Sequence, residues 1–320
     1  MTLRVGVTGA TGFIGWHVAA HLLASGREVR AVVRPESTRK TPPGVAVVRA
    51  RLDAAALRDA FAGVDVVVHL AALVSTTRDV EYTAVNIEGT RAVAEACQAD
   101  GARLIHISSL AAAGPASAAL PRSEGAPPAP VTPYGWSKLQ GERIVAGTAG
   151  LSWMILRPGV VYGPGDRAML PLFRLAKRGV LPLVGRPDAA YTVAHISDVV
   201  RAIEAALSTR ADGETVFVGH PKPATARQFL EGVRSAVGRA AAMIPIPLGL
   251  TRAAALVGDL VGSVIGRPLP LNRRRYIELT AEGFVCRVDR LRDCLGVVAE
   301  TDLDEGLAQT AAWYRRAGWI

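Results

Sequence analysis

The chain is poor in cysteine and in aromatic residues. Its 320 residues contain three cysteines, at positions 97, 286 and 294, and no Cys-x-x-Cys pair. Such spacing indicates neither a disulfide framework nor a zinc site, so we expect no bound metal and a reducing compartment. We also expect no signal peptide, because the first structured turn is predicted almost at Met1. Together these expectations favour a cytoplasmic location.

Long uninterrupted apolar runs are also missing. The most apolar late stretch, residues 240–265, contains Pro245, Pro247, Arg252 and Asp259. It therefore falls short of the ~20 uninterrupted apolar residues that a bilayer-spanning helix needs. For residues 246–265 we favour a helix packed in a smaller lobe. A lid over a greasy substrate and peripheral contact with a membrane surface stay open as alternatives.

Runs of like charge are scarce as well. The formal net charge is +9, but the basic residues are scattered, and only residues 273–275 form an arginine run. No zinc-finger, RNP or helix-turn-helix pattern accompanies them, which argues against nucleic acid as a partner. A basic surface suits an anionic cofactor or an anionic membrane better. Half of the residues are hydrophobic, so the chain is globular and long enough for a nucleotide domain plus a smaller lobe.

The most informative stretch that is present lies between a predicted strand at residues 3–7 and a predicted helix at residues 13–23. At such a turn a dinucleotide pyrophosphate rests on the helix N-terminus. We predict that Gly9 permits the tight turn, Gly12 lets the backbone approach the phosphates, and Gly15 lets the helix pack closely on the strand. Phosphate contacts are then expected at Thr11, Gly12, Phe13 and Ile14. An ordinary tight turn is the alternative, and the strand-helix frame argues against it.

The end of the second predicted strand, at residues 28–34, bears on the cofactor. An acidic residue there binds the adenosine 2′-hydroxyl of NAD, whereas arginine accommodates the 2′-phosphate of NADP. Arg34 holds that place, and Arg39 and Lys40 follow it. Because a guanidinium forks onto phosphate and a second cation reinforces it, we favour NADP. In the alternative, the loop is merely solvated and Glu36 binds the ribose of NAD.

Further strands are predicted at residues 45–48, 65–72, 103–108, 153–157 and 214–218, with helical patterns between most of them. Alternation of this kind predicts a Rossmann-type α/β fold with a doubly wound parallel sheet. We assign residues 1–165 to the dinucleotide domain, with residues 190–210 returning to it, and residues 166–320 mainly to a substrate lobe. His69 and His106 fall within predicted strands and are interpreted as neutral, packed histidines.

A chemical constellation follows the fifth predicted strand. Ser109 lies at the carboxyl end of that strand, where ligands of such sheets bind. Tyr134 and Lys138 are four residues apart on a predicted helix and share a face. The ammonium is expected to lower the pKa of the phenol, which then exchanges a proton with a carbonyl or alcohol oxygen. Ser109 would donate a hydrogen bond to the same oxygen.

In this order and separation, the glycine turn, Ser109 and the Tyr134–Lys138 pair resemble the short-chain dehydrogenase/reductase superfamily. Residues 13–15, 86–90 and 157–165 resemble its extended branch. The resemblance implies that Ser109, Tyr134 and Lys138 are catalytic. It also implies that Asp53, which we expect to cap a helix, contacts adenine. The other implied cofactor contacts are Leu52, Leu70, Ala71, Ala72, Asn86, Ser108, Pro158, Val160 and Val161.

Three functional interpretations follow from the resemblance. The segment Val33-Arg34-Pro35 and the apolar tail resemble dihydroflavonol reductases and 3β-hydroxysteroid dehydrogenases, which implies an NADP(H)-dependent reductase of a hydrophobic ketone or aldehyde. A nucleotide-sugar epimerase that uses NAD is the runner-up, since Arg167, Arg174 and Arg186 could anchor a second diphosphate. A non-catalytic NADP-sensing regulator is disfavoured by the intact Tyr134–Lys138 pair. A family-typical homodimer would use the helices around Arg91 and Tyr134.

Overall fold

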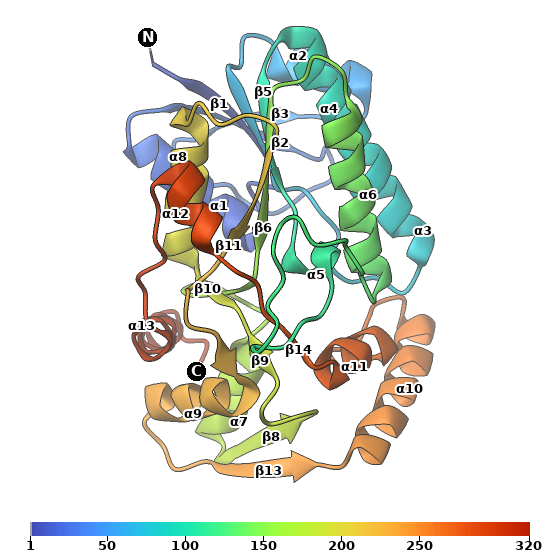
Figure 1. Ribbon diagram of the computed structural model, residues 1–320, viewed down its shortest axis with the longest axis vertical. Helices are drawn as coiled ribbons and strands as arrows, with labels where there is room; N and C mark the ends of the chain where they lie inside the picture. The colour runs from blue at the N-terminus through green and yellow to red at the C-terminus, as the bar shows by residue number, and fades with distance from the viewer. Residues whose placement is uncertain (1) are drawn as a thin grey trace.

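A seven-stranded parallel sheet forms the centre of the computed structural model, which describes residues 2–320 (Figure 1). In spatial order its strands are β11 (Glu214–Val218), β6 (Trp153–Pro158), β5 (Arg103–Ile107), β4 (Val66–His69), β1 (Arg4–Thr8), β2 (Glu28–Val33) and β3 (Ala46–Arg49). The strand order reverses between β1 and β4. In open α/β sheets ligands bind outside the carboxyl ends of the strands at such a switch point, so the predicted doubly wound fold is confirmed.

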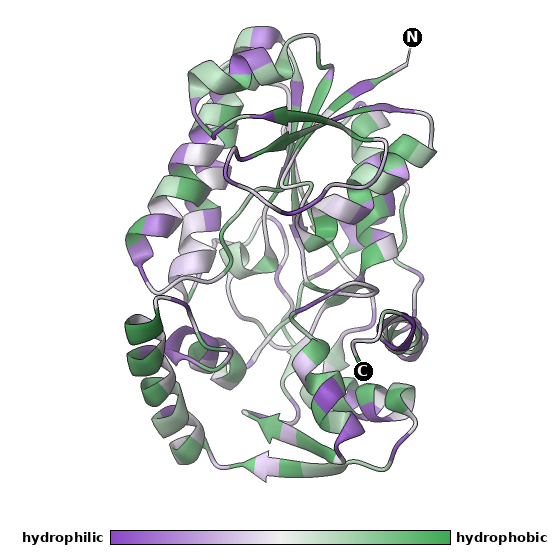
Figure 2. Ribbon diagram, turned by 180° about the vertical axis from the view of Figure 1, so that it is seen from behind, coloured by the Kyte–Doolittle hydropathy of each residue, from purple (hydrophilic) through white to green (hydrophobic). Residues whose placement is uncertain are grey.

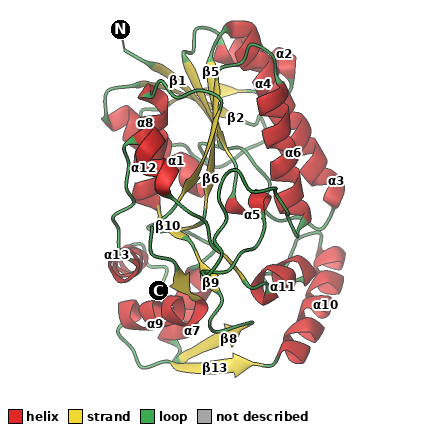
Figure 3. Ribbon diagram, viewed as in Figure 1, coloured by secondary structure: helices red, strands yellow, loops and turns green. Residues whose placement is uncertain are grey.

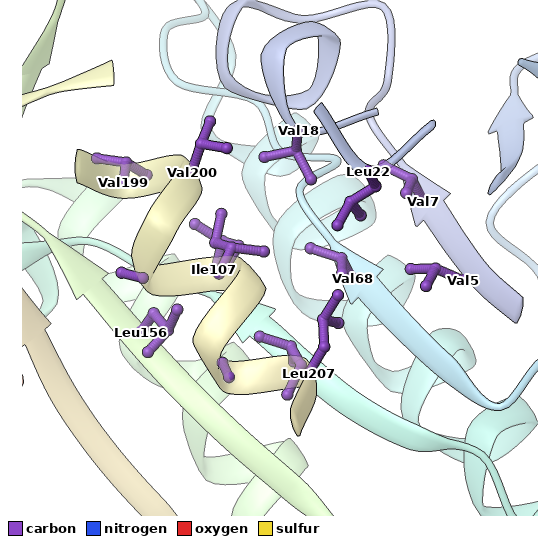
Figure 4. Close-up of a cluster of buried hydrophobic side chains, with 14 of the residues drawn as sticks. Val5, Val7, Val18, Leu22, Val68, Ile107, Leu156, Val199, Val200 and Leu207 are labelled. Carbon is purple, nitrogen blue, oxygen red and sulfur yellow. The ribbon is translucent and has the colours of Figure 1, made fainter. Parts of the chain in front are cut away.

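Helices cover both faces of this sheet (Figures 1 and 3). One face carries α1 (Phe13–Ala24), α8 (Ile196–Ser208) and α12 (Asp289–Leu295), and the other carries α2 (Ala54–Phe61), α4 (Gly89–Asp100) and α6 (Pro133–Gly147). Val66 and Val68 belong to the core under α1 and α8, whereas Val67 belongs to the core under α2 and α4. This alternation follows the two-residue repeat of a strand and explains why the strand is apolar throughout. Figure 4 shows part of the first core, including Val18 and Leu22 of α1.

The helical segment that contains Asn86 begins at Asp79. A short helix α3 (Asp79–Tyr82) leads into a π-helical segment η1 (Thr83–Glu88), which continues as α4. Such π-segments are often associated with functional sites. Here the segment contains Asn86, whose contacts are described below.

The smaller lobe is assembled from several later segments. A two-stranded parallel sheet of β8 (Val180–Val184) and β13 (Ala242–Ile246) lies with α7 (Leu170–Lys177), α9 (Ala226–Val237) and α13 (Leu303–Arg316). Two further small sheets join the lobes: β7 (Val160–Tyr162) with β10 (Val193–His195), and β9 (Ala190–Tyr191) between β12 (Ala224–Thr225) and β14 (Gly283–Phe284). The remaining helices are α5 (Leu110–Ala113), α10 (Leu248–Ile265) and α11 (Arg273–Thr280).

The chain crosses between the lobes more often than the sequence indicated. The segment that returns to the sheet after residue 190 continues past residue 210, because β11 forms one edge of the sheet and α12 packs on it. The loop at residues 110–131 begins with α5 and is tied to β14 through bridges from Ala116 to Phe284 and from Arg122 to Cys286.

The packing expected for the helix at residues 246–265 holds for one side of it only, where Thr251, Ala255, Gly258 and Gly262 are buried. Only 22% of the residues of α10 are buried, and Figure 2 shows the helix as an apolar element at the periphery of the protein. Pro245 lies in β13 and Pro247 caps the helix, so neither interrupts it. By length and composition alone, α10 is the one helix within residues 2–320 that is long and apolar enough to cross a membrane. This corrects the expectation that the stretch is too interrupted.

Candidate active site

The turn after β1 has the close packing that its glycines predict. Gly9 adopts a φ of +72°, and a Cβ atom there would lie 2.7 Å from the backbone nitrogen of Ala71 and the carbonyl carbon of Leu70. A Cβ atom at Gly15 would lie 2.2 Å from the carbonyl oxygen of Gly9. The turn therefore excludes side chains at both positions, and it brings Leu70, Ala71 and Ala72 beside the start of α1.

One of the predicted phosphate contacts, the N–H group of Gly12, is not available to a ligand. The N–H group of Gly12 donates to the carbonyl oxygen of Gly9 at 2.9 Å, so it is already paired within the turn. Gly12 caps α1 in an extended conformation with no capping side chain within residues 2–320. The first-turn N–H groups of Phe13 and Ile14 precede the first residues that have an intrahelical acceptor. These groups fit an anion, as does the positive end of the helix dipole.

A buried hydrogen-bond chain fixes the neighbouring strand ends. The Thr8 hydroxyl lies 2.7 Å from Nδ1 of His69 and accepts two backbone N–H groups that follow β4. Nε2 of His69 lies 3.1 Å from the Thr90 hydroxyl, which donates to a backbone carbonyl. Burial lowers the pKa of His69 to about 3, and it also lowers the pKa of His106 well below its usual value. Both histidines are neutral structural residues, as predicted.

The loop after β2 presents arginines of two kinds. Arg34, Arg39 and Lys40 are exposed, as their predicted contact with a 2′-phosphate requires. Arg49 donates to the carbonyl oxygens of Arg34 and Pro35 and holds the loop in place. The sequence analysis missed this role, although a basic residue ending the adjacent strand is a detectable signal.

Glu36, the alternative ribose ligand, is engaged by a second arginine that the sequence analysis missed. Arg51 forms an ion pair with it. A hydrogen bond from the backbone of Glu36 itself and the nearby Arg51 and Arg34 lower the pKa of its carboxyl group. The carboxylate of Glu36 is therefore ionised at neutral pH and already engaged by Arg51.

Two further predicted contacts have structural partners. Asp53 caps α2 by accepting from the N–H of Ala56 at 2.9 Å, as predicted, and Leu52 packs against the core under α2 and α4. Asn86 bridges the loop after β4 to α6: its side chain accepts from the N–H of Leu73 at 2.7 Å and donates to the Ser137 hydroxyl at 2.9 Å. Asn86 therefore fixes the loop that follows β4.

The two serines at the end of β5 have different environments. The hydroxyl of Ser108 is buried and donates to Glu142, so its side chain points into the protein and does not fit the predicted cofactor contact. The hydroxyl of Ser109 is only partly buried and accepts from the N–H of Ala111 at 3.2 Å, at the start of α5. The choice of Ser109 over Ser108 as the catalytic candidate therefore fits the structure.

Helix α6 positions Tyr134 and Lys138. Thr132 caps the helix through the N–H of Gly135, and Pro133 occupies the first turn. Lys138 is 2% exposed, and its Nζ donates to the carbonyl oxygen of Ile107 at 2.8 Å. Burial lowers the pKa of Lys138 to about 8. The lysine is thus held rigidly beside the end of β5, with N–H groups left for a ligand.

The expected direction of the Tyr134 pKa is wrong. Burial raises it to about 12, hydrogen bonding with Ser109 lowers it, and Glu278 and Tyr82 raise it. Lys138 is not among the groups that shift it. The physical reason is desolvation, which disfavours the phenolate more than the surrounding dipoles favour it. Tyr134 is therefore a protonated phenol at neutral pH and suits the role of a proton donor.

A buried ion pair lies behind the lysine and was missed by the sequence analysis. Glu142 is one turn beyond Lys138 on α6, and Arg157 ends β6. The guanidinium donates to both carboxylate oxygens at 2.8 and 2.6 Å, and the two side chains are only 6% and 8% exposed. The spacing of Tyr134, Lys138 and Glu142 at every fourth position is the sequence signal that could have indicated a role for Glu142, because it places the three side chains on one face of the helix.

The segment after β6 is a strand and not only a turn. The N–H of Val160 donates to the carbonyl oxygen of Thr192 at 2.9 Å, so it is not free for the predicted cofactor contact. The contacts expected at Pro158 and Val161 remain predictions. Asp198 is fully buried and accepts from Arg201 and from the N–H of Thr301. Its role is structural.

Helix α11 reaches the surroundings of Tyr134 through Arg274 and Glu278. The guanidinium of Arg274 stacks over the Tyr82 ring at 5.6 Å and contacts Asp79, and the Tyr82 ring lies 6.3 Å from that of Tyr134. Glu278, also on α11, is close enough to raise the pKa of Tyr134. The substrate side of the candidate site is therefore built by a segment that no sequence motif identified.

Comparisons with known proteins agree with this arrangement. Residues 5–219 match the family model of the NAD dependent epimerase/dehydratase family. The chain is 31% identical to ceramide reductase of Caulobacter vibrioides over 99% of this chain and 96% of the relative. It is 32% identical to sterol demethylase protein B of Methylococcus capsulatus over 98% and 99%. A solved structure of MoeE5 in complex with UDP-glucuronic acid and NAD is similar with a TM-score of 0.78 and 30% identity, over 98% of this chain and 99% of that one.

Proposed function

The chain belongs to the NAD dependent epimerase/dehydratase family and is an NAD(P)-dependent oxidoreductase acting on CH–OH and C=O groups; from this premise, we propose that it uses NADPH to reduce a ketone on a hydrophobic, lipid-like substrate. The observation that carries the proposal is the protonated Tyr134 held beside Ser109 and the buried Lys138. A phenol with a raised pKa gives up its proton only to a developing alkoxide, which is what reduction produces.

The proposed mechanism assigns one task to each side chain. The bound nicotinamide supplies the hydride. Tyr134 gives its proton to the carbonyl oxygen, and Ser109 donates a hydrogen bond to the same oxygen. Lys138 holds the ribose with the N–H groups that Ile107 leaves free. Gly9 and Gly15 keep the turn free of side chains, so that the pyrophosphate rests against the start of α1.

Preference for NADP is supported by the loop after β2. Arg34 is exposed and its side chain has no carboxylate partner within residues 2–320. Glu36 is paired with Arg51 and is therefore less available for a ribose hydroxyl. A 2′-phosphate would meet Arg34 without breaking an existing ion pair.

The relatives and the arginines of the lobe support a lipid-like substrate. Two relatives that match almost the whole chain are named as a ceramide reductase and a sterol demethylase protein. Of the arginines considered for a sugar diphosphate, Arg167 stacks on Trp319 at 4.9 Å, Arg174 donates to the Trp319 carbonyl, and Arg186 lies 3.7 Å from Asp188. Each of the three therefore already has a partner.

A nucleotide-sugar epimerase is the second candidate, because MoeE5 was solved with UDP-glucuronic acid and NAD and is similar over nearly the whole chain. The test is to incubate the enzyme with NADPH and long-chain ketones, and separately with NAD and UDP-sugars. We expect NADPH consumption with the ketones and no epimerised sugar. Epimerisation without net cofactor turnover would favour the second candidate.

The variant Tyr134→Phe tests the assigned chemistry. We expect it to lower kcat for ketone reduction about 100-fold or more, since general acid catalysis contributes typically 10²–10⁴-fold. Tyr162→Phe is the matched control, because the Tyr162 hydroxyl is buried without a hydrogen-bond partner within residues 2–320. Unchanged turnover in Tyr134→Phe would remove Tyr134 from its role.

A homodimer through α4 and α6 is part of the proposal. A shallow groove of about 330 Å³ between these helices is lined by Arg91, Gln140 and Arg143, and Trp136 on α6 is 51% exposed. Light scattering of the protein and of Trp136→Glu tests this face. A dimer that persists in the variant would place the interface elsewhere.

A further inference from the structure

Helix α10 turns its small residues inward and its large apolar residues outward. The buried positions are Thr251, Ala255, Gly258 and Gly262, which lie at a helical spacing of four, three and four. A Cβ atom at Gly258 would lie 2.0 Å from the carbonyl oxygen of Leu271, so this stripe packs directly on the backbone of the segment that follows. The opposite side of the helix is left free.

That free side is a continuous apolar face, which we call the α10 face. It consists of Leu250, Leu256, Val257, Leu260, Val261, Val264 and Ile265. Leu260 is 68% and Val264 80% exposed, and no residue within 2–320 covers them. A soluble protein rarely leaves so long an apolar stripe in water without an interaction partner.

The charges around the face indicate the partner. Arg252, Arg267 and Arg273 are exposed, and within residues 2–320 none of their guanidinium groups forms an ion pair, although the backbone N–H of Arg273 donates to Asp259 at 3.2 Å. Residues 248–280 contain five arginines and only two acidic residues. Unpaired arginines beside an apolar stripe complement the anionic headgroups and acyl chains of a bilayer surface. A second copy of the chain fits less well, because a symmetric contact would bring the same arginines toward one another.

We propose that the α10 face docks on an anionic phospholipid membrane, with the helix lying in the headgroup region. The helix does not span the bilayer in this arrangement, because its inner stripe stays packed on the protein. The proposal goes beyond the reductase activity, but its purpose rests on the lipid-like substrate proposed above.

Docking at this face connects the membrane with the candidate active site. Helix α11 follows α10 after a short segment, and the two helices are in contact. Arg274 of α11 reaches the carbonyl oxygen of Thr76 and stacks on Tyr82, beside Tyr134. A hydrophobic substrate would thus leave the bilayer next to the residues that reduce it.

The test is flotation of the full-length protein with phosphatidylcholine vesicles, with and without phosphatidylglycerol. We expect binding to the anionic vesicles that is at least about tenfold stronger than to the neutral ones, since each arginine near an anionic surface contributes about 1 kcal/mol, or about fivefold. Leu260→Asp/Val264→Asp should abolish flotation. The control Leu120→Asp, at a side chain that is 80% exposed elsewhere, should bind like the wild type.

The electrostatic part has its own matched pair of variants. Replacing Arg252, Arg267 and Arg273 with glutamine should weaken binding to anionic vesicles about tenfold or more. The same replacement at the exposed Arg58, Arg210 and Arg316 should not. Equal effects of the two triple variants would show that only net charge matters and would overturn the assignment to this face.

Two further outcomes would overturn the proposal. One is a wild-type protein that stays with the soluble fraction on anionic vesicles. The other is a Leu260→Asp/Val264→Asp variant that floats like the wild type, or that changes only the oligomeric mass in light scattering, which would make a second copy the partner. Vesicle binding is measured without substrate, and turnover of a water-soluble ketone is measured without vesicles. Failure of docking is therefore distinguishable from failure of the reductase function.

Discussion

The ion pair between Glu142 and Arg157 provides the sharpest test of how the active-site helix is held. The change Glu142→Gln keeps the shape of the side chain and removes its charge. Arg157 is then left as a buried cation, 7% exposed, between the sheet and the Phe217 ring. Removing one partner of a buried pair typically costs about 3–5 kcal/mol, so we expect the free energy of unfolding to fall by about 3 kcal/mol.

The same change should move the pH dependence of catalysis. Glu142 raises the pKa of Lys138, against the burial that lowers it to about 8. Without this carboxylate, Lys138 loses its proton at lower pH. The alkaline limb of the kcat/KM profile for ketone reduction should therefore shift to lower pH in Glu142→Gln.

Urea unfolding of the wild type, Glu142→Gln, Arg157→Met and the double variant measures the coupling. The double variant should be more stable than Glu142→Gln alone, because no buried charge is left unpaired. The control Glu88→Gln breaks an exposed pair with Arg91 and should change stability by less than about 1 kcal/mol. A cost below about 1 kcal/mol for Glu142→Gln, together with an unshifted pH profile, would refute the reasoning.

Three further predictions concern the turn, the cofactor and the lysine. Gly15→Ala should destabilise the protein and abolish NADP binding as measured by titration calorimetry, because its Cβ would lie 2.2 Å from a carbonyl oxygen. The control Gly147→Ala has open space around the new Cβ and should change neither stability nor NADP binding. Arg34→Ala should weaken NADP about tenfold or more while leaving NAD nearly unchanged, since a charge-assisted hydrogen bond contributes about 1.5–3 kcal/mol; equal losses for both would contradict a 2′-phosphate contact. Between pH 8 and 10.5 Lys138 is deprotonated in the folded state and still protonated in the unfolded state, so the free energy of unfolding should rise with pH. Relative to Lys138→Met, the wild type should gain on the order of 3 kcal/mol of stability across this window. A flat difference in denaturant midpoints across that window would refute the burial argument for Lys138.

Local patterns in the sequence were sufficient for the sheet and for the nucleotide turn. The strands from β1 to β6 and β11 were each located to within a few residues, because they are short apolar runs, although the edge strand β3 is largely exposed. The conformations of Gly9 and Gly15, the cap formed by Asp53 and the neutral state of His69 follow from neighbours that are close in sequence or in adjacent strands. For these features the backbone geometry leaves few alternatives.

The chemistry of the site depended on contacts between distant segments. The pKa of Tyr134 rises because the fold buries the phenol and places Glu278 of α11 near it, and its spacing from Lys138 in the sequence does not reveal that burial. The partner of Glu142 comes from β6 and the partner of Glu36 from the loop after β3, and the pattern of charges alone did not assign them. Desolvation and ion pairing depend on three-dimensional distance, so the sequence indicated which groups were present but not which form they take.

The apolar helix α10 shows the same division most clearly. Its composition predicted an apolar segment, and the sequence left open whether that segment was packed, covered a substrate or touched a membrane. Only the fold decided that the small residues face the protein and the large ones face outward, because a backbone packs closely only where side chains are small. The sequence by itself determined the order of the elements and which groups are candidates for proton transfer, and the tertiary structure decided the partners of those groups, how deeply they are buried and which face of α10 is left free.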